Sequence, residues 1–161
     1  MPGGTDRRRV GSIVMSAGID PRLEAVIAGG IPRKRVEVVS LHLSALTPVA
    51  LSLVRVDDPE LLGLSLCEGY GGVWSELQLV LDPAPADGDG SAMVWVYGED
   101  DAWVACGFGR EMNHEGVRAT FREESQVFPV VEGFWLVSFW PDGTRAPAEE
   151  NEPVDVEPLS S

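Results

Sequence analysis

Residues 134–140 read Phe-Trp-Leu-Val-Ser-Phe-Trp, and six of these seven side chains are apolar. Successive side chains of an extended strand point to opposite faces, so this stretch is apolar on both faces. Such a pattern is typical of a strand inside a sheet that is covered on both sides. Pro141, Asp142 and Gly143 follow, and these residue types end strands in turns. The stretch therefore predicts a central strand of a β-rich fold.

Other strand-like stretches occur before it, separated by glycine-rich and acidic segments. Apolar and polar residues alternate in several of them, which is the pattern of a half-buried strand. Residues 41–56 also place apolar side chains at helical spacing, so a helix remains an alternative there. The predicted strands are residues 36–43, 49–56, 62–67, 74–81, 93–97, 103–108, 117–122 and 134–140.

One helix is predicted ahead of the strands. Asp20 can accept hydrogen bonds from the free N–H groups of a first helical turn, and Pro21 suits the first helical position. Gly29 and Gly30 then end the helix. The sequence predicts a mainly β fold, or an α+β fold with one short N-terminal helix. Its expected architecture is an antiparallel sandwich, roll or half-barrel of about seven to nine strands.

The length of 161 residues suits one folded domain with a tail at each end. We predict a flexible basic arm over residues 1–18, a single β-rich domain over 19–146 and an acidic disordered tail over 147–161. The arm contains three consecutive arginines, and the start of translation is open between Met1 and Met15. The tail is rich in proline and carries five acids and no base, which favours disorder.

The chain is strongly acidic, with 26 Asp and Glu against 12 Lys and Arg and a net charge of -14. Such a charge repels the phosphates of nucleic acids, which argues against direct nucleic-acid binding by the body of the protein. It favours a basic protein partner, and mimicry of nucleic acid is one form that this binding takes. Solubility alone is the alternative interpretation. No stretch suits a membrane span or a complete signal peptide, so we expect a cytoplasmic protein, with secretion left open.

The densest polar cluster of the body lies at residues 110–116. Glu111 and His114 lie there, and Cys106 precedes them, so a thiolate–imidazole pair is one hypothesis. A hydrated hairpin loop is the alternative. No nucleophile, phosphate-binding or dinucleotide-binding motif occurs, and we therefore lean towards a protein that is not an enzyme. A disulfide between Cys67 and Cys106 is left open.

Aromatic residues are spread over several predicted strands, and more of them occur than one dry face of a small sheet can bury. Most are expected in the core, yet one aromatic patch beside an acidic turn is typical of a binding surface. The predicted partner-binding residues are Trp95, Tyr97, Trp103, Trp135, Glu99, Asp100 and Asp101.

These patterns favour a non-enzymatic acidic interaction protein, of an inhibitor, immunity-type or regulatory kind, that binds a basic protein partner. One alternative is a β-barrel that binds a small ligand among its tryptophans. The other is a small enzyme that uses Cys106 and His114. We expect neither a cofactor nor a metal, because His42 and His114 lack the spacing of a metal-binding motif.

Overall fold

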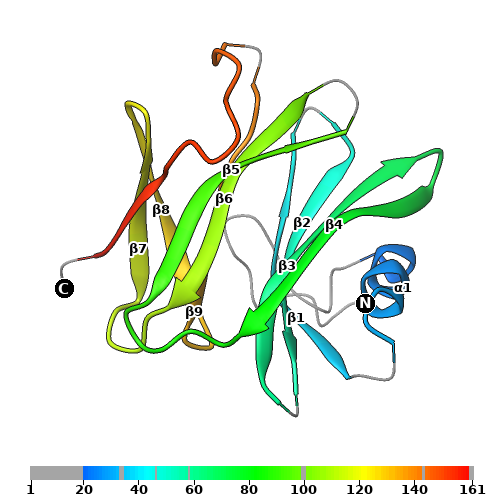
Figure 1. Ribbon diagram of the computed structural model, residues 1–161, viewed down its shortest axis with the longest axis horizontal. Helices are drawn as coiled ribbons and strands as arrows, with labels where there is room; N and C mark the ends of the chain where they lie inside the picture. The colour runs from blue at the N-terminus through cyan, green and yellow to red at the C-terminus, as the bar shows by residue number, and fades with distance from the viewer. Residues whose placement is uncertain are drawn as a thin grey trace. The chain divides into compact units, whose positions relative to one another are not determined.

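A computed structural model of the chain describes residues 20–32, 35–45, 47–57, 59–98, 101–142 and 144–159. These residues form one helix and ten strands, and every paired strand runs antiparallel to its neighbours. The chain divides into two compact units, Met1–Ala84 and Pro85–Ser161, with one sheet in each (Figure 1). The mainly β fold with a half-barrel is confirmed. The two units differ from the single domain predicted over residues 19–146, and the predicted arm over 1–18 lies outside the described residues.

The first unit is a four-stranded sheet with a helix packed against it. The sheet has the order β1-β2-β3-β4, so each strand pairs with its neighbour in sequence. Residues 41–56 form strands here, and the helix left open for them is wrong, because β2 pairs along its full length with β3. The elements are α1 (Pro21–Gly29), β1 (Val36–Leu43), β2 (Val49–Val56), β3 (Leu61–Tyr70) and β4 (Val73–Pro83).

Helix α1 begins where the sequence predicts. The Asp20 carboxylate accepts a hydrogen bond of 2.8 Å from the Arg22 backbone N–H, and Pro21 occupies the first helical position. Leu23 and Ile27, four residues apart, lie on one face of the helix and are buried in the core of this unit. The helix contacts β4 and β3, and its apolar face covers one side of the sheet.

The second unit is a curled six-stranded sheet with the order β10-β7-β8-β9-β6-β5. Its core combines large aromatic and smaller aliphatic side chains, with Trp103, Phe121, Trp135 and Phe139 among them. The stretch that predicts a central strand forms β9, which is buried at every position and lies inside the sheet. The strands are β5 (Gly90–Tyr97), β6 (Ala102–Arg110), β7 (Gly116–Phe121), β8 (Glu124–Val131), β9 (Phe134–Phe139) and β10 (Asp155–Pro158).

The C-terminal segment closes this curled sheet. The Asn151 N–H donates to the Val94 carbonyl at 2.9 Å, and the Val94 N–H donates to the Glu152 carbonyl at 2.9 Å. The Val154 N–H donates to the Ala92 carbonyl at 3.1 Å, which fastens the segment to β5. Directly afterwards, β10 pairs with β7. One stretch of chain therefore joins the two edges of the sheet, as the red segment of Figure 1 shows.

The prediction of a disordered tail over residues 147–161 is wrong for the residues of it that the structure describes. Val154 is buried in the core of the second unit and Val156 packs against that core, whereas Asp155 and Glu157 are exposed. This alternation is the pattern of a strand with one dry face. The acidic, proline-rich composition of the segment hides this pattern in the sequence, because the pattern rests on only two apolar side chains, Val154 and Val156.

Candidate functional site

The loop between β6 and β7 brings together two of the residues singled out in the sequence. His114 Nδ1 lies 2.7 Å from Glu111 Oε2. Asp87 supports the loop, because its carboxylate accepts hydrogen bonds from the Met112 backbone N–H at 2.8 Å and the Asn113 side-chain amide at 3.4 Å. The loop is therefore an ordered structure in which a carboxylate orients an imidazole ring.

Cys106 does not join this pair. Its side chain in β6 is 1% exposed, and burial raises the pKa of the thiol. Within the described ranges, no hydrogen bond links Cys106 to His114. A buried neutral thiol is a poor nucleophile, so the thiolate–imidazole pair is not assembled. The disulfide left open by the sequence is not formed either, since Cys67 and Cys106 are both buried free thiols.

The space beside Glu111 is too small for most substrates. A hollow of about 120 Å³ lies there, with Ser91, Trp135 and Glu157 also in its lining. Small-molecule sites usually occupy about 300–1,000 Å³. Among the described residues, the Glu111–His114 pair is therefore not joined by the Cys106 thiol, and the hollow beside Glu111 is smaller than a usual substrate site.

Three of the four aromatic residues predicted to bind a partner are buried, and two of them belong to the core cluster of the second unit. Trp103 is 4% exposed and Trp135 is 5% exposed. The ring of Trp135 rests on Gly90 and Gly109, where an added Cβ would lie 2.6 Å and 2.5 Å from a ring carbon. Only glycine leaves room for the indole at these positions. Neither tryptophan is available on the surface of the folded unit.

The other predicted partner-binding residues lie at the end of β5 and in the turn that follows. Trp95 is half-buried and Tyr97 is 9% exposed. Asp101 is exposed and adopts a positive φ of 52°, which suits a tight turn. Glu99 and Asp100 lie outside the described residues.

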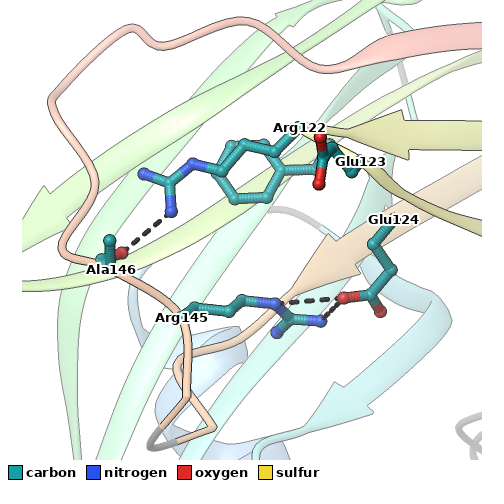
Figure 2. A pocket seen from close by; sticks show the side chains of 6 residues that line it. Arg122, Glu123, Glu124, Arg145 and Ala146 are labelled. Carbon is teal, nitrogen blue, oxygen red and sulfur yellow. Dashed lines mark hydrogen bonds and ion pairs between the residues drawn. The ribbon is translucent and has the colours of Figure 1, made fainter.

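A larger hollow of about 510 Å³ opens at the turn between β7 and β8 (Figure 2). It brings the β7–β8 turn next to the chain that leaves β9, so segments distant in sequence form one site. Its lining residues are Phe121, Arg122, Glu123, Glu124, Arg145 and Ala146.

Arg122 fastens the C-terminal segment at this hollow. Its Nε and Nη2 atoms donate to the two carboxylate oxygens of Glu152 at 2.8 Å and 3.1 Å, which lowers the pKa of Glu152. The same guanidinium donates to the carbonyls of Ala146 and Pro147 at 2.9 Å and 3.0 Å. It also lies 4.8 Å from the centre of the Phe121 ring. Arg122 is therefore a structural side chain whose charge is balanced within the protein.

Arg145 has the same kind of role on the other side of the hollow. Its guanidinium donates to the Glu124 carboxylate, with 3.1 Å from Nε, and to the Trp140 carbonyl. The hydrogen bonds from Arg145 to Glu124 lower the pKa of the Glu124 carboxyl. Both arginines are paired internally, and Glu123 adds an exposed carboxylate to the lining of the hollow.

The acidic charge is unevenly divided between the two units. Residues 85–161 contain 16 Asp and Glu against four Arg, a net charge of -12, whereas residues 1–84 have a net charge of -2. Strands β5, β7 and β9 run in the same direction, so the segments that follow them meet at one end of the second unit (Figure 1). Five exposed carboxylates lie in these segments, and we call them the acidic end: Asp101, Glu123, Asp142, Glu149 and Glu150.

Fold and surface together define a two-unit antiparallel β protein whose second unit is a closed, acidic half-barrel. No known protein family, curated protein or solved structure matches the chain. Over the described ranges, no helix is long and apolar enough to span a membrane. In the same part of the chain, no three His, Cys, Asp or Glu side chains are grouped to hold a metal ion.

His42 gives the stability of the protein a dependence on pH. Burial in β1 lowers the pKa of its imidazole from 6.5 to about 3, so the folded protein keeps it neutral. Between these values the unfolded chain binds one more proton, and stability falls as the pH falls. Going from about pH 7 to about pH 5 should lower the free energy of unfolding by about 2 kcal/mol.

Urea unfolding at these two pH values measures the effect. The carboxylates with lowered pKa, such as Glu124, begin to lose their contribution near their ordinary value of 4.5, below this window. His42→Leu should flatten the dependence, whereas the matched control His114→Asn should retain it. An unchanged dependence in His42→Leu would show that another group is responsible.

Proposed function

We propose that this protein binds a basic protein partner through the acidic end of its second unit and does not itself catalyse a reaction. The observation that carries the proposal is the net charge of -12 on residues 85–161. A concentrated negative field accelerates the encounter with a positively charged partner and disfavours nucleic acids. An arrangement of this kind is suited to an inhibitor or regulator, including one that mimics nucleic acid.

The internal pairing of the arginines supports the proposal. Arg122 forms an ion pair with Glu152, and Arg145 forms one with Glu124, both within the second unit. Among the described residues, no ion pair joins either arginine to the exposed carboxylates Glu149 and Glu150. Asp142 is the exception, because its carboxylate lies 3.9 Å from Arg145 Nη1. The other four carboxylates of the acidic end form no ion pair among the described residues and remain available to an external cation.

Binding is favoured over catalysis because the best candidate for a reactive site is incomplete. Cys106 is buried and its thiol is kept neutral, and the hollow beside Glu111 is small. The larger hollow at Arg122 has the size of a small-molecule site, which supports ligand binding as a second candidate function.

Affinity purification of the tagged chain from its native cells tests the proposal. At an ionic strength of about 0.01 M, where the Debye length is about 30 Å, a basic protein should co-purify. It should be lost or strongly reduced at about 0.15 M or higher, where that length is about 8 Å or less. A bait without a partner at either ionic strength contradicts the proposal and favours the ligand-binding candidate.

A charge-matched pair of variants locates the interaction. Glu123→Gln, Glu149→Gln and Glu150→Gln together should slow association about tenfold at low ionic strength, since steering changes on-rates by factors of about 10–1,000. The control removes three exposed charges from the first unit, with Glu24→Gln, Asp57→Asn and Asp82→Asn. Stopped-flow measurement of association with the recovered partner should show little change in the control. An equal effect of both variants would mean that only total charge matters.

A further inference from the structure

We propose that the basic partner binds as an added β-strand along the free edge of β8, at residues 125–127. The inference rests on the proposed function, because the charge of the second unit selects a basic segment. It adds the docking surface and the form in which the partner binds.

The free edge arises because β8 and β9 separate after a very short ladder. Although β8 has eight residues, it pairs with β9 only through Val130 opposite Trp135 and Val131 opposite Phe134. The next residue of β8 towards its start is Pro129, which has no backbone N–H to donate. A ladder towards β9 therefore lacks a donor at this position, and the pairing ends there.

The register on the other side of β8 shows which backbone groups face the free edge. The Val130 N–H donates to the Glu115 carbonyl of the β7 side at 2.8 Å. In an antiparallel ladder, hydrogen-bonded pairs alternate with pairs that are not hydrogen-bonded. The register then assigns Gln126 to the bonds with β7, while the N–H and C=O groups of Ser125 and Val127 point away from β7. Among the described residues, no strand pairs with β8 on that side at these positions.

The side chains along this edge are open to solvent. Val127 is 53% exposed, and Ser125 and Gln126 are also exposed. Exposed strand edges with apolar side chains are uncommon on monomeric proteins, which usually protect them with charges, proline or bulges. Here Pro129 interrupts the edge at one end, and residues 125–127 carry no charge. Extended peptides bind such edges through main-chain hydrogen bonds.

Charge complementarity selects a basic segment as the occupant. The free edge begins next to Glu123 and the hollow of about 510 Å³, so side chains of an added strand would reach an exposed carboxylate. A second copy of this chain would bring two units of net charge -12 together, which like-charge repulsion disfavours. A basic extended segment has both the backbone groups and the charge that this edge requires.

The test uses a short blocked peptide that alternates arginine with valine, added to the full-length isotope-labelled protein at low ionic strength. The amide resonances of Ser125 and Val127 should shift on binding. Val127→Pro removes an N–H that points away from β7, so the β7 ladder is kept while the affinity should fall about tenfold. The matched control Val127→Thr keeps the N–H and should bind within about twofold of the unmodified protein. Thermal unfolding checks that each variant is folded.

A second measurement leaves the protein unchanged. The same peptide with its amides methylated along one edge keeps its charge but cannot extend the sheet, and it should bind about tenfold more weakly. The added strand is overturned if the methylated peptide binds as tightly as the unmethylated one, or if Val127→Pro binds the peptide as tightly as the unmodified protein does. Either result leaves the proposed function in place. A basic peptide that does not bind at all overturns both. Self-association that Val127→Pro abolishes would identify a second copy as the occupant and overturn the inference.

Discussion

Deleting residues 147–161 is expected to unfold the second unit. The deletion removes the pairing of β10 with β7, three backbone hydrogen bonds to β5 and the buried side chain of Val154. It also leaves Arg122 without the Glu152 carboxylate. At about 1 kcal/mol for each hydrogen bond and about 2 kcal/mol for a buried valine, the loss is on the order of 5 kcal/mol or more. Small domains have total stabilities of about 5–15 kcal/mol.

Hydrogen exchange measures this effect element by element. Amide protection should collapse in β5 and β7, the two strands that the C-terminal segment joins, and the near-ultraviolet circular dichroism of the tryptophans should weaken. The control ends the chain at Leu159, which keeps every described residue and should remain folded. If the longer deletion kept full protection of β5 and β7, the closing role of the segment would be refuted.

Local patterns were sufficient to predict most of the fold. The strands predicted at 36–43 and 49–56 have the bounds observed for β1 and β2, and α1 begins beside its predicted cap at Asp20. In each case, the signal lies within about ten neighbouring residues: an apolar pattern bounded by turn or capping residues. Such signals do not depend on how the sheet curls.

Strands β8 and β10 were not predicted, and the reason is the same for both. β8 contains Glu124, Gln126 and Pro129, and a proline argues against a strand unless its missing N–H lies on an unpaired side. That condition is met only because β8 leaves β9, which is a property of the whole sheet. β10 is four residues long and acidic, and it becomes a strand only because two sheet edges require a partner.

The contacts of the candidate site show the same difference between local signals, which the sequence reveals, and long-range contacts, which it does not. Glu111 and His114 are three residues apart, and their contact could be anticipated from one loop. Arg122 and Glu152 are 30 residues apart, and no local pattern indicates that the arginine fastens the C-terminal segment. The charge of the chain is readable from composition, whereas its concentration in one unit depends on where the units divide.

Replacing Trp135 with alanine should lower the free energy of unfolding by about 3–5 kcal/mol, the usual effect of truncating a large buried aromatic side chain. Trp135 is 5% exposed and lies in the core of the second unit, on a surface formed by Gly90 and Gly109. Neither glycine has a side chain that could fill the space left by the indole. The cavity would therefore persist, and its effect should lie in the upper part of this range.

Chemical denaturation measures the change, with Trp95→Ala as the matched control. Trp95 is half-buried, so its truncation should lower the free energy of unfolding by less than half as much. Trp135→Phe keeps an aromatic ring and remains measurable if the alanine variant does not fold. If Trp135 were a partner anchor, these variants would weaken binding with little effect on stability. A loss of stability together with the retained salt-sensitive association of Trp135→Phe would identify Trp135 as a core residue that supports the acidic surface without contacting the partner.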